Sequence, residues 1–203
     1  YFVFCAINNT YKITPQIFDI WMKILNKVEK SVIWLLENNE SSKNNLIREA
    51  NIRGVNKERL VFAKRTSHEK YMSQFKYADL FLDTFIYGAG ATASNALWMG
   101  VPLLTMTGNS YSARMATSLL HSVGLKELIT SSKKDYEELA LKLSTDEKQL
   151  KAIKEKLIEN LSNNPLFNTN LYTKDFEDGL EQVFKNYVAG NMPKNVYAKS
   201  KIC

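Results

Sequence analysis

The chain has 203 residues, with 27 Lys and Arg against 21 Asp and Glu, which gives a net charge of +6. Hydrophobic residues make up 45% and charged residues 24%, values that exclude a mostly disordered or fibrous chain. The cysteines and histidines are few and far apart in sequence, so we expect no disulfide scaffold and no metal site. The modest positive surplus is typical of a lysine-rich solvated surface, and we expect no nucleic-acid binding.

The first residues and the hydropathy of the chain indicate where in the cell the protein is expected. No apolar run approaches the roughly 20 residues that a membrane-spanning helix needs. The apolar segment 2–7 has neither a basic leader nor a cleavage site, which favours a buried strand over a signal peptide. We therefore expect a cytoplasmic protein without a membrane span. Because the chain opens inside a predicted strand, without Met, we expect it to be part of a longer protein.

Apolar segments of strand length alternate with segments of helical period. The predicted strands are 2–7, 31–37, 60–63, 78–84, 101–106 and 125–129. The predicted helices are 15–28, 46–52, a helix opening at Ser67, 95–99 and 112–122, then 134–143, 146–161 and 173–188, with a polar turn at 38–45. Strands separated by helices imply right-handed crossovers. We therefore predict an α/β fold, a Rossmann-like parallel sheet with helices on both faces and a helical C-terminal region.

The chain shows no internal repeat and no linker rich in Pro or Gly. We expect one domain over 1–203, with its helical extension from about 133. Thr14 before Pro15 is typical of a helix start, and Gly54 of a left-handed helix end. The three tryptophans fall on apolar faces and are expected in the core: Trp21, Trp34 and Trp98.

Ligands of open parallel sheets bind beyond the carboxyl ends of the strands. This rule selects the loops 8–12, 63–68, 87–95 and 105–114. In the third loop, the small residues from Gly88 to Thr92 let a ligand oxygen approach backbone N–H groups at a helix start, and Ser94 adds a hydroxyl. The pattern suits a pyrophosphate. A loop kept small for close helix–sheet packing is the alternative.

Charged and polar side chains in these loops are further candidates, each with a structural alternative. Lys12 would offer positive charge to a leaving group, or is a solvated lysine. His68 and Arg65 would contact a sugar, a base or a phosphate, or are surface residues. Arg114 would hold phosphate or pair with a carboxylate, and Asn95 would bind ribose or its own loop.

Two carboxylates lie on or beside the fourth predicted strand. Asp79 and Asp83 would suggest acid–base chemistry if they faced one another, but their spacing leaves the separation open. Asp83 ends the strand, and stabilisation of the turn that follows is the alternative. No pattern resembles a Ser–His–Asp triad.

A longer pattern identifies a family. The segment from Tyr87 to Thr105, Tyr-Gly-Ala-Gly-Ala-Thr-Ala-Ser-Asn-Ala-Leu-Trp-Met-Gly-Val-Pro-Leu-Leu-Thr, resembles the nucleotide-sugar signature of the O-linked N-acetylglucosamine transferases. Other blocks match that family in the same order: 9–15, 31–36, 78–84, 112–120 and 164–169. The resemblance covers nearly the whole chain. It implies the C-terminal, donor-binding lobe of a GT-B enzyme, with the acceptor lobe and tetratricopeptide repeats outside this chain.

The resemblance also implies an activity. The donor would be a UDP-sugar and the acceptor a Ser or Thr hydroxyl of a protein, with inverting transfer of N-acetylglucosamine and without metal or cofactor. Lys12 at the matching position would neutralise the departing diphosphate, and Gly90, Ala91 and Thr92 would donate hydrogen bonds to it. The isolated chain would bind nucleotide without turnover, because the acceptor lobe and the general base lie elsewhere.

Other matching positions complete the implied donor site. Asn95 would hold the ribose, Asn9 would lie near the sugar diphosphate, His68 would approach the uridine, and Arg65 stands where Lys or Arg is usual. The sequence departs from the family pattern where Gly90 replaces a common His, Asn9 replaces Gln and Asn95 replaces Asp.

Two other functions fit the same pattern. A UDP-sugar epimerase has lobes of this architecture, and a non-catalytic nucleotide-binding or scaffolding lobe is compatible with the departures from the family pattern. The last predicted helix carries an apolar stripe through Phe176 and Phe184. By resemblance the stripe would pack on the missing lobe, and packing on its own sheet is the alternative.

Overall fold

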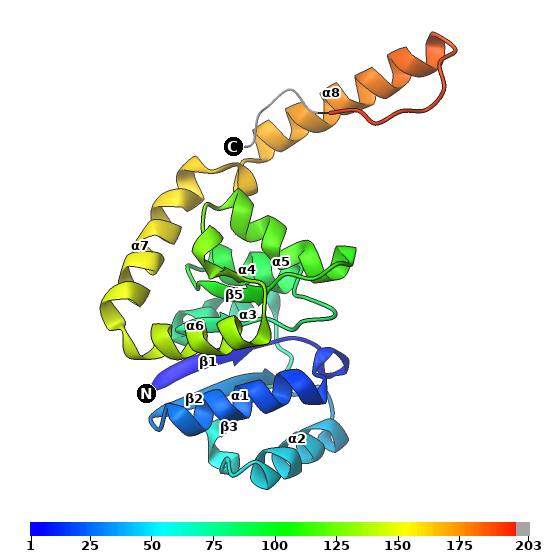
Figure 1. Ribbon diagram of the computed structural model, residues 1–203. Helices are drawn as coiled ribbons and strands as arrows, with labels where there is room; N and C mark the ends of the chain where they lie inside the picture. Colours follow the sequence, from blue (N-terminus) through cyan, green and yellow to red (C-terminus); the bar gives the residue numbers. More distant parts are fainter. Residues whose placement is uncertain (198–203) are drawn as a thin grey trace.

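The computed structural model describes residues 1–197 of the chain (Figure 1). The strands of this range are β1 (Phe2–Ala6), β2 (Ser31–Leu36), β3 (Leu60–Ala63), β4 (Leu80–Leu82), β5 (Leu103–Met106) and β6 (Ile129–Thr130). They form one parallel sheet in the order β3-β2-β1-β4-β5-β6. The Rossmann-like α/β fold predicted from the sequence is confirmed.

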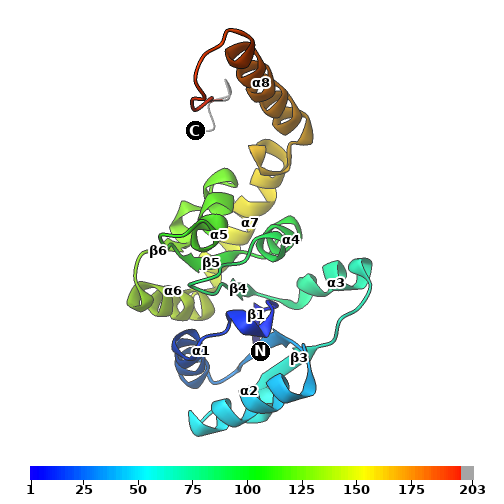
Figure 2. The ribbon, with the colours of Figure 1, turned by 90° about the vertical axis from the view of Figure 1, so that its right-hand side faces the viewer.

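Helices cover both faces of this sheet. They are α1 (Pro15–Lys27), α2 (Glu40–Ile52), α3 (His68–Gln74), α4 (Ala91–Trp98), α5 (Tyr111–Ser122) and α6 (Lys133–Thr145). In Figure 2, α1 and α6 lie to the left of the strands, and α3 and α4 lie to the right. α1 packs on α6, and α5 packs beside α4 and on β5. Phe4 of β1 pairs with Ile33 and Leu80 in the middle of the sheet, where all three side chains are fully buried. Burial on both faces explains why the strands are almost wholly apolar.

The C-terminal helices leave the sheet. α7 (Glu147–Asn163) runs along the side of the body, where Lys154 forms an ion pair with Asp79 at 2.9 Å. α8 (Thr169–Val188) then projects away from the body, as Figure 1 shows. In this projecting helix no residue is buried within the described part of the chain. Between residues 1 and 197, no helix is both long and apolar enough to cross a bilayer.

Three predicted helix boundaries differ from the structure. α2 begins at Glu40, inside the segment predicted to be a polar turn, because the Asn39 side chain accepts a hydrogen bond from the Ser42 backbone N–H at 2.8 Å. α8 begins at Thr169 instead of 173, capped by Asn168. α4 begins at Ala91, four residues before the predicted helix 95–99. No hydrophobic pattern signals these starts, because α2 and α8 begin at asparagine caps and α4 begins among small residues without a side-chain cap.

Two local predictions are confirmed and two are wrong. Gly54 has φ +75° at the end of α2, and the Thr14 side chain caps α1 before Pro15. The predicted strand 125–129 is wrong, because residues 126–128 form a 3-10 turn before the short β6. Trp98 is also wrong as a core residue, since 54% of it is exposed at the end of α4, where it contacts Phe167 edge to face.

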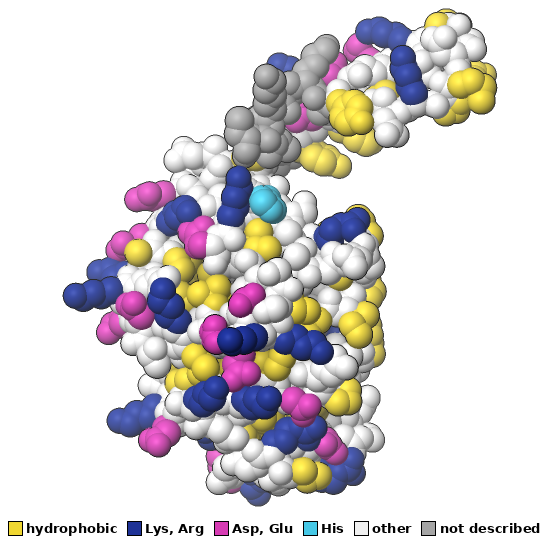
Figure 3. Space-filling model, in the orientation of Figure 1, with side chains coloured by type: hydrophobic (Ala, Val, Ile, Leu, Met, Phe, Trp, Pro, Cys, Tyr) yellow, Lys and Arg dark blue, Asp and Glu magenta, His cyan; other side chains and the backbone are white. Residues whose placement is uncertain are grey.

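Charges are mixed over the surface. Figure 3 shows basic and acidic side chains interspersed on one face of the body. Surface ion pairs such as Lys27–Glu137 and Lys156–Glu127 join groups of opposite sign. This agrees with a solvated lysine-rich surface, and the expectation that the chain binds no nucleic acid stays a prediction.

Candidate functional site

A cavity of about 520 Å³ lies beyond the carboxyl ends of β1, β2 and β3. It also borders the loop and helix that follow β4, through Tyr87 and Thr92. The strand order reverses direction between β1 and β4, the place where open α/β sheets bind ligands. Five residues predicted from the sequence line this one cavity: Asn9, Lys12, Arg65, His68 and Thr92.

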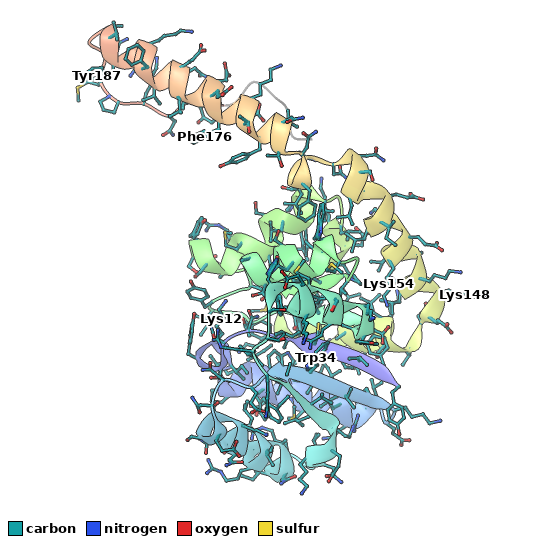
Figure 4. The ribbon with its side chains drawn as sticks, turned by 180° about the vertical axis from the view of Figure 1, so that it is seen from behind. Lys12, Trp34, Lys148, Lys154, Phe176 and Tyr187 are labelled. Carbon is teal, nitrogen blue, oxygen red and sulfur yellow. The ribbon has the colours of Figure 1, made fainter. Side chains whose placement is uncertain are left out.

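Lys12 ends a 3-10 turn directly after β1, and its ammonium group is held on three sides. Lys12 Nζ donates to the Gly88 carbonyl at 3.0 Å, lies 3.5 Å from Asn8 Oδ1, and stands 4.4 Å from the centre of the Tyr87 ring. Burial lowers the pKa of Lys12, and the negative charge of Asp83 opposes this shift. The three neighbours are acceptors or a π face, and they suit a positively charged amine. Figure 4 shows Lys12 across the sheet from Lys154, away from α7.

Asp83 organises the turn that faces Lys12. Asp83 Oδ1 accepts from the backbone N–H groups of Thr84 and Ala89, both at 2.7 Å, and Oδ2 accepts from the Thr105 hydroxyl at 2.8 Å. The residue is 1% exposed, and burial raises its pKa to about 6, against the opposing effect of those donors and of Lys12. The contacts of Asp83 are therefore those of a residue that stabilises the turn after β4, the alternative given from the sequence.

Asp79 lies at the opposite end of β4. It accepts a hydrogen bond from the Val3 backbone N–H at 3.0 Å and pairs with Lys154. The strand separates Asp79 from Asp83, and each carboxylate has its own partners. The two do not form a facing pair for acid–base chemistry.

Arg65 and Asn9 form one polar wall of the cavity. Arg65 Nη2 donates to Asn9 Oδ1 at 3.2 Å and to Asn38 Oδ1 at 3.4 Å. Both pairs are exposed to solvent, so they hold the guanidinium loosely. His68 opens α3 on the same side, with its ring 6.4 Å from that of Tyr71. This wall offers several hydrogen-bonding groups to a polar ligand.

Tyr71 connects α3 to the start of α4. Its pKa is raised by burial, and hydrogen bonding to the side chains of Asn95 and Thr92 opposes that shift. Its ring packs edge to face on Phe75 at 5.2 Å. Asn95 itself is not among the residues that line the cavity. The phenol therefore stands between the cavity and Asn95.

The remaining predicted residues lie outside the cavity lining. Gly90 is the residue before α4, and Ala91 is the first residue of that helix. Arg114 is exposed on α5, where its guanidinium contacts the backbone carbonyl of Asn109. The N-terminus of α4 presents its partial positive charge at this end of the sheet. Roles for Gly90, Ala91 and Arg114 stay predictions.

Sequence reasoning missed several cavity residues. Asn8, Tyr11 and Tyr87 surround Lys12, and Tyr71 closes the side next to Thr92. The sequence gives little indication that these residues form a site, because an asparagine after a strand and an aromatic residue in a loop are common features. Tyr71 lies one helical turn after His68, and this spacing places both on one face of α3.

A metal site would need several ligands close together. Within residues 1–197, no three His, Cys, Asp or Glu side chains are grouped so that they could hold a metal ion. The charged groups that line the cavity are mainly cations, with Lys12, Lys64 and Arg65 among them. This donor set favours an anionic ligand.

Comparison with known proteins gives consistent matches. Residues 1–176 match glycosyl transferase family 41. A UDP-N-acetylglucosamine–peptide N-acetylglucosaminyltransferase of Caenorhabditis elegans is 34% identical over 188 residues, which cover 93% of this chain and 16% of the relative. A probable enzyme of the same description from Arabidopsis thaliana is 28% identical, over 96% of this chain and 20% of its own length. The chain thus spans about a fifth or less of these relatives.

Solved structures agree with the fold. A mutant O-GlcNAc transferase of Thermobaculum terrenum superposes with a TM-score of 0.88 at 28% identity, over 94% of this chain and 37% of that one. The C-terminal domain of a group 1 glycosyl transferase from Francisella tularensis superposes with a TM-score of 0.60 at 13% identity, over 80% of this chain and 84% of that domain. The second likeness concerns the fold alone, and it is that of a GT-B C-terminal domain.

Proposed function

Because this chain belongs to glycosyl transferase family 41, we propose that it is the nucleotide-sugar-binding lobe of a protein O-glycosyltransferase. The donor is UDP-N-acetylglucosamine, and the acceptor is a Ser or Thr hydroxyl of a protein, bound by a second lobe outside these residues. The names of the matched relatives and the cavity at the switch point of the sheet support this proposal. A volume of about 520 Å³ lies within the range of small-molecule sites, about 300–1,000 Å³.

The observation that carries the proposal is the position of Lys12. When the bond between the sugar and the diphosphate breaks, negative charge grows on the β-phosphate oxygen. An ammonium group next to that oxygen stabilises the charge in the transition state more than in the ground state, and this lowers the barrier. Lys12 Nζ is held at the cavity by Gly88, Asn8 and Tyr87, so little reorganisation is needed when the charge forms.

Other groups complete the proposed donor site. The N-terminus of α4 and the Thr92 hydroxyl face the diphosphate, and Asn95 holds the ribose through the network that includes Tyr71. His68, Arg65 and Asn9 bind the nucleotide on the opposite wall. Fixed cations, hydroxyls and a helix N-terminus supply the stabilisation that a metal ion gives in other transferases, so we propose transfer without metal or cofactor.

Nucleotide binding by the chain itself tests the proposal. At 100 times its dissociation constant, UDP stabilises the folded chain by about 2.7 kcal/mol, which corresponds to an increase in Tm of about 5–10 °C. Lys12→Ala largely removes this increase because the diphosphate loses its cation. Thermal unfolding with and without millimolar UDP measures both effects. A wild-type chain with unchanged Tm at millimolar UDP contradicts the proposal.

Lys154→Ala is the matched control. Lys154 is also partly buried and paired, with Asp79, but it lies across the sheet from the cavity. Its loss lowers the Tm of the free chain slightly and leaves the UDP effect unchanged. If Lys12→Ala and Lys154→Ala reduced the UDP-induced increase in Tm equally, the net charge of the chain, and not the position of Lys12, would account for UDP binding.

Turnover is tested on the longer protein. With UDP-N-acetylglucosamine and a protein acceptor, we expect transfer of the sugar to Ser or Thr, detected by mass spectrometry. An epimerase instead changes the UDP-sugar without acceptor, and a scaffolding lobe binds UDP and transfers nothing. Cytoplasmic localisation stays a prediction.

A further inference from the structure

Asn8 lies directly after β1 and lines the cavity beside Lys12, although only 2% of the residue is exposed. Its Oδ1 atom is 3.5 Å from Lys12 Nζ. An ammonium group only donates hydrogen bonds, so the amide atom that faces it is the oxygen. The nitrogen, Nδ2, therefore points elsewhere, and within the described residues it has no hydrogen-bond partner.

A buried donor without an acceptor is unfavourable, because the group has lost its water and gained nothing in exchange. A ligand that brings an acceptor oxygen to this atom removes the penalty when it binds. We infer that Asn8 is a further donor-site residue, whose Nδ2 donates a hydrogen bond to a β-phosphate oxygen of a bound nucleoside diphosphate. This inference rests on the proposed function and assigns a contact within the same site.

The neighbouring turn shows why a side-chain donor is needed here. Three of its backbone N–H groups are already used within the protein: those of Thr84 and Ala89 bind Asp83, and that of Gly88 binds the Ser112 carbonyl at 3.1 Å. These groups are not free to face a phosphate. The amide of Asn8 is an unused donor next to the cation proposed to meet the β-phosphate.

The contact is coupled to Lys12. Asn8 Nδ2 is closed off from solvent, while Oδ1 of the same amide faces the Lys12 ammonium. A phosphate that binds the Lys12 ammonium therefore lies beside the Asn8 side chain. Lys12 and Asn8 therefore act as a pair on one phosphate group, and their effects on binding are not additive.

Calorimetric titration of the 203-residue chain with UDP and with UMP tests the inference. Asn8→Asp keeps the shape of the side chain but replaces the donor with a negatively charged acceptor. We expect it to weaken UDP binding at least tenfold and to change UMP binding by less than twofold, because UMP has no β-phosphate. Asn8→Ala removes the amide without adding charge, and we expect it to weaken UDP binding about threefold to tenfold, again with UMP little changed.

Asn160→Asp is the matched control. Asn160 lies on α7, outside the cavity, and its Nδ2 atom donates to the Val123 carbonyl at 2.8 Å. Loss of this hydrogen bond lowers Tm and leaves UDP binding unchanged. The Tm of each Asn8 variant without ligand shows whether it folds. UDP binding equal to wild type in both Asn8 variants, or equal losses for UDP and UMP, overturns the inference alone. A wild-type chain that binds neither nucleotide overturns the proposed function and this inference with it.

Discussion

Asp83 is a charged side chain in the interior, 1% exposed, and burial raises its pKa to about 6 from an ordinary value near 3.8. The folded chain therefore binds this proton more tightly than the unfolded chain does. The stability that Asp83 contributes is fully present below about pH 4 and is lost as the pH rises through about 6, a difference of about 3 kcal/mol. Its ionised form at neutral pH is a cost to folding that its hydrogen bonds reduce.

Asp83→Asn removes that titration. The amide keeps an oxygen for the N–H groups of Thr84 and Ala89, while Thr105 rotates to accept from the new nitrogen. We expect the Tm of the variant, relative to wild type, to increase between pH 5 and pH 7.5, as followed by thermal unfolding across that range. Asp79→Asn, which removes the carboxylate at the other end of β4, is the control for the loss of a charge. A constant Tm difference for Asp83→Asn would contradict the raised pKa.

At the scale of single residues, the sequence predicted which loops carry polar groups but not how those groups pair. Lys12, Asn9, Arg65, His68 and Thr92 come to one cavity because the carboxyl ends of parallel strands share an edge, a rule that needs only the order of elements. The buried amide of Asn8 and the Tyr71 phenol depend on side-chain packing between elements. No spacing along the chain specifies such contacts.

The turn between β4 and α4 depends on the absence of a side chain at Gly88. A Cβ atom there would stand 3.0 Å from the Ser112 carbonyl oxygen and 3.1 Å from Asp83 Oδ2. Both neighbours are held by hydrogen bonds, so they have little freedom to move. Close approach of the turn to α5 and to Asp83 therefore requires glycine.

Gly88→Ala is expected to destabilise the chain by about 1–3 kcal/mol, because the added methyl group overfills a packed turn. The UDP effect on Tm should also decrease, since the Gly88 carbonyl holds Lys12. Gly179→Ala is the control, because Gly179 lies inside α8 with nothing within 4 Å of a new Cβ. There the substitution should stabilise by about 0.5–1 kcal/mol. Denaturant unfolding of both variants measures the contrast, and similar changes in both would refute the steric argument.

Element type was more predictable than element boundary. The strands β1 to β5 were found from runs of apolar residues, because burial on both faces imposes that composition. α2 was placed six residues late, since a helix that faces solvent carries few apolar residues, and in the described chain only Ala50 of this helix is buried. Its start depends on one hydrogen bond from Ser42 to the Asn39 side chain, which no periodicity signals.

At the scale of the molecule, α8 is a helix whose apolar stripe is left exposed by residues 1–197. Six of its apolar and aromatic side chains are each at least 50% exposed: Tyr172, Phe176, Leu180, Val183, Phe184 and Tyr187. Figure 4 shows Phe176 and Tyr187 on the helix that leaves the body, far from the sheet. Packing on its own sheet, one of the two alternatives from the sequence, does not occur. An exposed patch of this kind marks an interaction surface, and we propose that the remainder of the longer protein covers it.

A paired measurement tests that proposal. In the 203-residue chain, Phe176→Ser with Phe184→Ser should change stability by no more than about 0.5 kcal/mol for each site, because both residues are more than half exposed. In the longer protein, the same pair of changes should cost several times more, since removing a buried phenylalanine ring costs about 3–5 kcal/mol. Lys174→Ser, an exposed residue of the same helix, should have little effect in either. Equally small effects of the double variant in both proteins would mean that α8 stays uncovered and would overturn the proposal.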